Sequence, residues 1–277
     1  MVKHTISIRG GLGNQLFQVF MLMSYCIEDN CNYTFPSQML DWDKYRHPYW
    51  DTFFNELKHL VNTDNINKFI EFVEPNYHYN EIGPRTDNTI FVGYFQTELY
   101  FKKHFERICT DLKIREKQEV IKNKYIKSEN TIALHFRMGD FVNPAHHPIM
   151  PDTYYIDSLT HIINNTQFNG WNVYYSCESC DDAVVINRIN NIKQTFKQLT
   201  FIKINNEMED WEQMLLMSTC EHNIVANSSF SWWGAHFNTN ANKIVCYPSV
   251  WFGPAKNNLN LKNLHPESWT KIPLRTV

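Results

Sequence analysis

The second half of the chain alternates between apolar segments of strand length and segments of helical length. The strand segments are 131–136, 172–176, 199–204, 223–227 and 243–247, and the clearest helical segments are 181–196 and 209–220. Strands that alternate with helices form a mostly parallel sheet covered on both faces, because each parallel connection needs a crossover. This alternation therefore predicts an α/β fold.

The length of the chain predicts two lobes, because 277 residues are many for one hydrophobic core. In the first half, a short strand at Thr5–Ile8 leads through a turn into an apolar helix. Residues 111–130 are charged and poor in Gly and Pro, which predicts a helical connection. The predicted domains are 1–120 and 121–277, and the C-terminal tail is a candidate to pack back on the first lobe.

The middle of the first lobe has a weaker pattern. Residues 36–88 are aromatic, polar and irregular, with several prolines. Residues 89–96 predict a strand, and a helix is predicted to begin at Glu98. Asp41 and Asp43 have the Asp-x-Asp spacing that can hold a divalent metal against a diphosphate, but no clear apolar strand precedes them. No metal site is predicted here.

Charge and composition exclude several classes of protein. With 26 basic and 29 acidic side chains, the chain has no electrostatic basis for binding nucleic acid or an anionic membrane. The N-terminus enters a strand directly, without a basic and apolar signal segment, and no run of 18 apolar residues occurs. These features predict a cytoplasmic protein without a transmembrane segment. They give no prediction of the oligomeric state.

The seven cysteines are odd in number and mostly lie in apolar segments, as reduced thiols do. Cys177 and Cys180 have the spacing of a metal or redox pair. Because no second pair of this kind occurs, zinc binding and redox chemistry are not favoured.

Polar clusters follow three of the predicted strands, at His135–Asp140, Ser176–Asp182 and Asn227–Phe230. The carboxyl ends of parallel strands meet at one edge of a sheet, where α/β proteins bind ligands. In the last cluster a strand meets a Ser-rich helix start, where backbone amides and hydroxyls suit a phosphate. The alternative is a plain N-cap before a core helix.

The first cluster brings one Arg and one Asp to this edge. The guanidinium of Arg137 can bind a diphosphate through two N–H donors and stabilise its departure. Asp140 is a candidate to orient Arg137 or to act as a base. The alternative is an ion pair between these two residues that only closes the strand end.

Near the N-terminus, the segment Arg-Gly-Gly-Leu-Gly-Asn-Gln turns from a strand into a helix. Gly10, Gly11 and Gly13 let the backbone approach a ligand closely. The segment is not a dinucleotide fingerprint, because the third glycine position falls at Leu16, and it lacks the Gly-Lys-Ser/Thr of a phosphate loop. Asn14 is positioned either to hydrogen-bond a polar ligand or to cap the helix.

Several segments together resemble one known family. The three most specific are Gly10–Gln18, the His135-x-Arg137-x-Gly-Asp140 segment and Ala226–Ala235, and weaker similarities lie at 93–101, His147 with Tyr154 and Tyr155, 216–220 and 265–269. They resemble the inverting α-1,2-fucosyltransferases of glycosyltransferase family 11, in family order over nearly the whole chain. The sequence is identified as a member of this family.

The resemblance implies a GT-B-like architecture, with two Rossmann-like lobes and a nucleotide-sugar cleft between them. The first lobe would take the acceptor, and the second would hold the nucleotide without a metal or other cofactor. The resemblance implies that Arg137 contacts the β-phosphate and that His135 lies by the nucleotide. The donor loop Asn227-Ser228-Ser229-Phe230 would present hydrogen-bond donors to the diphosphate. The glycine loop with Gly11 and Gly13 resembles one in protein O-fucosyltransferases, which implies that Asn14 faces the donor.

An inverting transfer makes two demands on the enzyme. A hydroxyl displaces the diphosphate at the anomeric carbon through an oxocarbenium-like state, so the leaving group must be stabilised and the acceptor deprotonated. Arg137 with the helix start at 227–230 can meet the first demand without a metal. For the second, the candidate bases are Asp140 first and His147 next, and each could instead be structural.

Two departures from the family pattern concern the donor. Met138 stands where the family usually has a second Arg, and Gln213 stands where the family tends to have an Asp that the resemblance suggests reads guanine. A carboxylate accepts both guanine donors with charge assistance, whereas an amide offers a neutral acceptor and a competing donor, so Gln213 weakens the prediction of guanine. The predicted reaction is transfer from GDP-fucose to a galactose-type hydroxyl of a glycan. The alternatives are a UDP- or dTDP-linked deoxysugar donor and a non-catalytic carbohydrate-binding protein.

Overall fold

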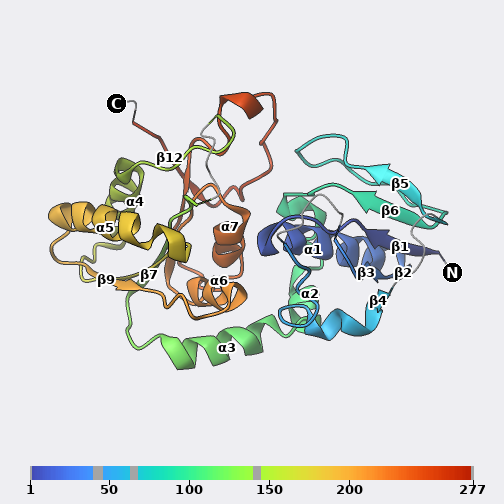
Figure 1. Ribbon diagram of the computed structural model, residues 1–277, viewed down its shortest axis with the longest axis horizontal. Coiled ribbons are helices and arrows are strands. Elements are labelled where there is room, and N and C mark those ends of the chain that lie inside the picture. The colour runs from blue at the N-terminus through green and yellow to red at the C-terminus, as the bar shows by residue number, and fades with distance from the viewer. Residues whose placement is uncertain (1, 40–45, 63–67, 140–144, 276–277) are drawn as a thin grey trace. The chain divides into compact units, whose positions relative to one another are not determined.

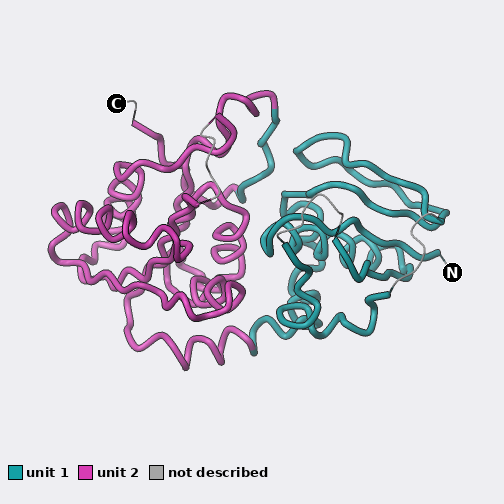
Figure 2. Tube along the Cα trace, viewed as in Figure 1, with its two compact units in different colours: residues 1–116, 259–266 teal, residues 117–258, 267–277 magenta. Residues whose placement is uncertain are grey.

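The computed structural model describes residues 2–39, 46–62, 68–139 and 145–275 (Figure 1). The chain forms two compact units, which Figure 2 shows in different colours. Unit 1 is Met1–Glu116 with Leu259–Pro266, and unit 2 is Lys117–Asn258 with Glu267–Val277. The change of unit falls within the segment predicted to be a helical connection, which forms α3 (Ile114–Tyr125).

Unit 2 contains a six-stranded parallel sheet in the order β12-β11-β10-β7-β8-β9. The strands are β7 (Thr131–His135), β8 (Asn172–Ser176), β9 (Thr200–Lys203), β10 (His222–Ile224), β11 (Val245–Pro248) and β12 (Thr270–Ile272). The helices are α4 (Asp152–Thr166), α5 (Asp182–Thr195), α6 (Asp210–Ser218) and α7 (Ser229–His236), with one-turn 3-10 helices η4 (Ser179–Asp181) and η5 (Pro254–Lys256). All five predicted strands and the parallel sheet are confirmed.

The core of unit 2 explains why β7 is central. All five residues of β7 are buried, as a strand covered on both faces requires. Tyr154 and Tyr155 of α4 are almost fully buried, and their hydroxyls donate to the carbonyl oxygens of Val225 and His135. These bonds satisfy polar groups inside the core and attach α4 to the carboxyl ends of the strands.

Unit 1 contains a parallel sheet in the order β2-β1-β6-β5 and a separate pair β3-β4. The strands are β1 (Lys3–Ile6), β2 (Asn32–Tyr33), β3 (Phe35–Pro36), β4 (Val61–Asn62), β5 (Ile70–Val73) and β6 (Thr89–Val92). The helices are α1 (Leu12–Asp29) and α2 (Phe105–Asp111), with 3-10 helices η1 (Asn55–Leu60) and η3 (Glu98–Tyr100). The predicted strand–turn–helix at the N-terminus is confirmed.

The prediction of a continuous helix from Glu98 is wrong. Only η3 begins there, and Phe101 then adopts a φ of −138°, which is not helical. The ring of Phe101 is fully buried against Phe17 and Phe20 of α1. Burial of this ring fixes the break, and α2 begins only at Phe105.

None of the helices in the described ranges is long and apolar enough to cross a membrane.

Candidate functional site

The three polar clusters predicted at strand ends come together at one edge of the unit 2 sheet. The order of the strands places β7 between β10 and β8, all parallel, so their carboxyl ends are neighbours. The ring centroids of His135 and Phe230 are 5.4 Å apart. Nη1 of Arg137 donates to Oε1 of Glu178 at 2.5 Å. The cluster after β7 therefore contacts both of the other clusters.

His135 ends β7 as a buried, neutral imidazole. Its side chain is 4% exposed. Burial, assisted by the charge of Arg137, lowers the pKa of His135 to about 3. Its Nδ1 is buried without a hydrogen-bond partner among the described residues. At neutral pH the ring is therefore a packing and hydrogen-bonding group and not a source of charge.

Arg137 is oriented by Glu178 from the neighbouring cluster. The side chain of Arg137 is 16% exposed and that of Glu178 is 38% exposed. Asp181 supports the same segment, because its Oδ2 accepts a hydrogen bond from the amide of Gly139 at 2.8 Å. The carboxylate beside Arg137 is thus Glu178, a residue to which the sequence assigned no role. Asp140, the first candidate base, lies outside the described residues.

The start of α7 offers backbone amides to this edge of the sheet. Ser228 is the N-cap, with an extended backbone (φ −139°, ψ 129°), and within the described chain its hydroxyl makes no capping hydrogen bond. The first amides of a helix have no partner inside the helix. Ser228, Ser229 and Phe230 are each half-buried. Ser228 is thus an N-cap of a core helix, and the first amides of this helix also suit an anion.

Asn227 holds two loops next to this helix start. Its Nδ2 donates to the carbonyl oxygens of Pro148 and Trp251, at 2.9 and 3.0 Å. The side chain is 3% exposed, and its Oδ1 has no partner among the residues described here. The amide group of Asn227 therefore positions the loops, while the residues after it face the edge of the sheet.

The two loops bring a histidine and a lysine together. Nε2 of His147 and Nζ of Lys256 are 3.1 Å apart, and both groups lie against the ring of Phe252. Burial lowers the pKa of Lys256. Lys256 was not predicted, because nothing in the sequence around it marks a site.

The glycine loop of unit 1 has a defined geometry. Gly10 has a φ of 76°, and a Cβ added there would lie 2.3 Å from Nδ2 of Asn14. Asn14 does not cap α1, because the N-cap is Gly11. Its Oδ1 accepts a hydrogen bond from Nε2 of Gln96 at 2.7 Å, and Gly13 is buried in the first turn of the helix. The position of Asn14 facing the donor stays a prediction.

Gln213 lies near the start of α6, which packs against α7. Its Nε2 donates to the carbonyl oxygen of Met208 at 3.0 Å. Glu209 and Glu212 form a capping box at the start of the helix, and Oδ1 of Asp210 accepts from the next amide. These three carboxylates, which lie beside Gln213, are thus engaged by the helix start.

The Cys177–Cys180 segment has other partners in the structure. Sγ of Cys177 lies 3.3 Å from Oδ1 of Asp182, and burial raises the pKa of this thiol to about 12. A raised pKa disfavours the thiolate that metal binding and redox chemistry need. Glu178, Cys180 and Asp181 lie close enough to share an ion. Glu178 and Asp181 already bind Arg137 and the amide of Gly139.

The fold is that of GT-B-like glycosyltransferases. Over 98% of this chain and 90% of the other, the structure resembles E. coli ADP-heptose LPS heptosyltransferase II, with a TM-score of 0.50 and 11% sequence identity. It also resembles Arabidopsis thaliana FUT1 in complex with GDP, with a TM-score of 0.50 and 10% identity over 88% of this chain and 69% of that one. The predicted α/β, GT-B-like fold is confirmed.

The chain belongs to glycosyl transferase family 11, whose family model matches residues 3–263. It is 29% identical to an alpha-1,2-colitosyltransferase of Escherichia coli, over 96% of this chain and 97% of the relative. It is 32% identical to the O-antigen biosynthesis glycosyltransferase WbnK of Escherichia coli, over 60% of this chain and 50% of that protein. The protein is therefore a glycosyltransferase, as the three motifs indicated.

Proposed function

We propose that this glycosyltransferase transfers a sugar of the fucose type to a hydroxyl of a galactose-type residue in a glycan. The donor in this proposal is GDP-fucose, the product is α-1,2-linked, and the anomeric centre is inverted. The observation that carries the proposal is the meeting of Arg137 with the start of α7 at one sheet edge, through the contact of His135 with Phe230. A guanidinium and a helix start are together suited to a diphosphate.

The chain has the charges that departure of a diphosphate requires. As the glycosidic bond breaks, negative charge grows on the β-phosphate, and Arg137 and the first amides of α7 stabilise it. Lys256 adds a third positive group on a loop that Asn227 attaches to the same helix start. Among the described residues, no carboxylate forms an ion pair with Lys256, which leaves its charge for an anionic ligand.

The acceptor hydroxyl must lose its proton as it attacks the anomeric carbon. Asp140 remains the first candidate base, because it follows the strand that delivers Arg137. His147 is the weaker candidate, since Nε2 lies beside the ammonium of Lys256. In the proposed role, Asp140 accepts the proton while the helix start and Arg137 hold the departing diphosphate.

The side chain of Gln213 can accept a hydrogen bond from a guanine base in the donor, but without the charge of the carboxylate that the family tends to have. Its amide nitrogen is bound to the carbonyl oxygen of Met208, so the group presents Oε1, an acceptor. Within the described chain this oxygen has no hydrogen-bond partner. Guanine carries two adjacent N–H donors on one edge, which an acceptor can bind. UDP and dTDP donors remain the alternative to be tested.

A second candidate donor is nucleotide-linked colitose. The observation that favours it is the similarity to an alpha-1,2-colitosyltransferase over almost the whole of both chains. Colitose is fucose without its 3-hydroxyl, so the same diphosphate chemistry serves both sugars. The two donors therefore differ in the 3-hydroxyl, which fucose presents to the protein and colitose lacks.

The test is a nucleotide panel followed by a transfer assay. We expect GDP to raise the thermal unfolding temperature and UDP and dTDP not to do so. We expect Arg137→Ala to lower kcat by about a hundredfold or more, while Arg275→Ala, which breaks a surface pair with Asp157 in the same unit, leaves kcat unchanged. Stabilisation by UDP alone, or full turnover in Arg137→Ala, would contradict the proposal. Turnover with colitose but not fucose would select the second donor.

A further inference from the structure

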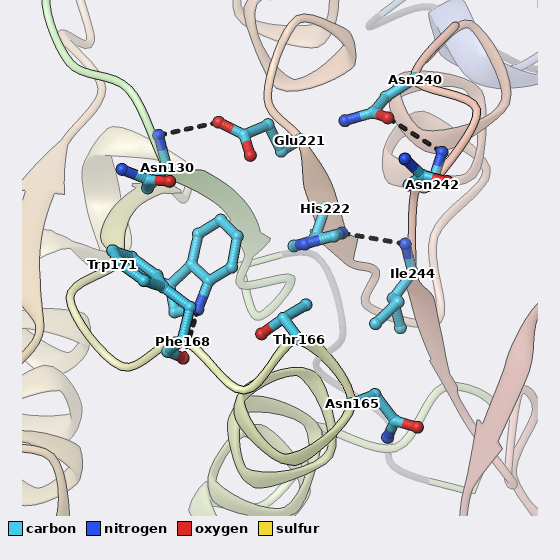
Figure 3. Close-up of a pocket in the computed structure, with 10 residues that line it drawn as sticks. All are labelled: Asn130, Asn165, Thr166, Phe168, Trp171, Glu221, His222, Asn240, Asn242 and Ile244. Carbon is cyan, nitrogen blue, oxygen red and sulfur yellow. Dashed lines mark hydrogen bonds between the residues drawn. The ribbon is translucent and has the colours of Figure 1, made fainter.

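A polar pocket lies at the opposite end of the unit 2 sheet from the proposed donor site. It has a volume of about 460 Å³ (Figure 3). Its lining residues are Asn130, Asn165, Thr166, Phe168, Trp171, Glu221, His222, Asn240, Asn242 and Ile244. Asn130 directly precedes β7 and His135 ends it, so the pocket and the proposed donor site are separated by the length of the strand, about 16 Å.

His222 is the most informative group in the pocket. It is 4% exposed, and its Nδ1 accepts a hydrogen bond from the amide of Ile244 at 3.0 Å. The ring proton is therefore on Nε2, and burial lowers the pKa of His222 to about 4, so the ring is neutral. Figure 3 shows the ring in the middle of the lining residues. The ring packs edge to face against Trp171, with the centroids 4.8 Å apart, and none of the described residues offers its Nε2–H an oxygen or nitrogen acceptor. The Nε2–H is therefore a donor available to a ligand hydroxyl in the pocket.

The remaining polar groups offer both donors and acceptors. Asn240 accepts the amide of Asn242 through Oδ1, which leaves its NH₂ for a ligand. Asn165 donates to the carbonyl oxygen of His161, which leaves its Oδ1 as an acceptor. Glu221 uses Oε1 to accept the amide of Asn130, and its second oxygen is available. A ligand that both donates and accepts many hydrogen bonds satisfies this set.

The aromatic side chains and the charged groups that line the pocket indicate which class of ligand it can bind. Phe168 is 38% exposed, and its ring packs edge-on against Trp171, with the centroids 5.1 Å apart. No lysine or arginine is among the described lining residues, which disfavours a phosphate. One carboxylate and one imidazole whose Nδ1 is already bonded are too few to hold a metal ion. An uncharged ring with many hydroxyls fits the volume, the amides and the exposed aromatic face.

We propose that this pocket binds a neutral hexose unit of a glycan chain, as a carbohydrate site separate from the site of transfer. The Nε2–H of His222 donates to a hydroxyl, the amides of Asn165 and Asn240 bind further hydroxyls, and the ring of Phe168 covers the apolar face of the sugar. The proposal does not depend on which nucleotide sugar is the donor.

The test is a titration of ¹⁵N-labelled full-length protein with galactose, glucose and lactose, followed by amide-resolved NMR. The indole N–H of Trp171, which donates to the carbonyl oxygen of Phe168, reports on the pocket. We expect its signal and the side-chain amide signals of Asn240 to shift saturably with at least one of these sugars. The absence of a shift with all three sugars up to high millimolar concentration would overturn the proposal.

Matched variants locate the binding. We expect Asn165→Ala to weaken the affinity about fivefold, as the loss of one hydrogen bond does, and Phe168→Ala to weaken it at least as much. Asn164→Ala, at the neighbouring exposed position outside the pocket, is the control and should bind like the wild type. Equal affinities in the Asn164 and Asn165 variants would overturn the proposal. If Phe168→Ala does not fold, the pair of asparagine variants decides. Failure of the donor proposal would appear in Arg137→Ala turnover and leave these shifts unchanged.

Discussion

At the scale of single residues, Met138 shows how a departure from the family pattern is accommodated. The guanidinium of Arg188 lies beside Met138, with Nη1 3.6 Å from the sulfur. Arg188 packs against the rings of Phe136 and Tyr155, and its Nε donates to Asp152. A cation from α5 thus lies next to the position where the family usually has a second arginine. The resemblance could not reveal this, because Arg188 is distant in the chain.

This arrangement predicts the effect of restoring the family residue. Met138→Arg would place a second guanidinium against that of Arg188, whose side chain is 13% exposed and whose carboxylate partner is already engaged. We expect a loss of about 1–2 kcal/mol in the free energy of unfolding. Met138→Leu, which keeps the apolar contact, should lose less than about 1 kcal/mol. Chemical unfolding measures both, and a stabilised Met138→Arg variant would contradict the interpretation.

His135 makes the stability of the protein depend on pH. Its pKa is about 3 in the folded chain, below the ordinary value of 6.5, so the unfolded chain binds the proton first. Stability is therefore lost as pH falls below 6.5, and the loss continues down to about pH 3. Each pH unit costs about 1.4 kcal/mol, so His135 contributes a loss of about 2 kcal/mol between pH 6.5 and pH 5.

Two variants isolate this contribution. We expect His135→Gln to lose about 2 kcal/mol less than the wild type between the same two pH values. Asn164→Gln, at an exposed position on α4 without a titratable group, should keep the pH dependence of the wild type. The free energy of unfolding in urea at each pH gives the comparison. An identical pH dependence in wild type and His135→Gln would show that burial does not shift this group.

At the scale of elements, the start of α7 is fixed by its connections to two loops. Asn227 lies between β10 and α7 and donates to the carbonyl oxygens of Pro148 and Trp251. Those loops pair with each other through the amide of Gly253 and the carbonyl oxygen of His146, 2.9 Å apart. One buried amide group therefore sets the geometry of the helix start and of the Lys256 loop together.

Asn227→Asp removes both donated hydrogen bonds and places a carboxylate against two carbonyl oxygens. We expect a loss of about 3 kcal/mol or more in the free energy of unfolding, because a buried charge is left without a partner. We also expect the KM for the donor to rise. Asn190→Asp, at an exposed position on α5, should change stability by less than about 0.5 kcal/mol. Similar unfolding temperatures for the two variants would contradict the role given to Asn227.

The elements that could be predicted are those with a strong local pattern. β7 and β8 are apolar runs that end in polar clusters, and both lie within a residue of their predicted bounds. β12 was missed, because three residues with an exposed lysine in the middle carry no strand pattern. The break at Phe101 was missed because it depends on contacts with α1, which lies far away in the sequence.

At the scale of the whole molecule, the sequence predicted those parts of the candidate site that lie in one short segment at the end of a strand. The sequence could place Arg137 and the 227–230 segment at one edge, because parallel strands share a direction. It could not place Glu178 beside Arg137 or Lys256 beside His147, because these contacts depend on how separate loops fold. The sequence also could not reveal the pocket around His222. Its lining residues lie largely at the amino-terminal ends of separate strands, far apart along the chain.

The distribution of charge over the chain bears on whether transfer needs a metal. The chain carries a net charge of −3, yet Arg137, Lys256 and the start of α7 supply positive charge to the proposed diphosphate site. Because these groups can offset the charge of the leaving group, we expect EDTA to change kcat less than about twofold. Asp41 and Asp43, the alternative metal ligands, lie outside the described residues.

The paired substitution Asp41→Asn with Asp43→Asn completes this test. If Arg137 and α7 stabilise the diphosphate, the double variant keeps its kcat and its insensitivity to EDTA, whereas Arg137→Ala loses turnover in the presence or absence of Mg²⁺. If the two carboxylates hold a metal ion, both EDTA and the double substitution abolish transfer, and added Mn²⁺ restores it only in the wild type. The kcat of the three proteins with and without EDTA separates these outcomes, because each mechanism removes turnover from a different variant.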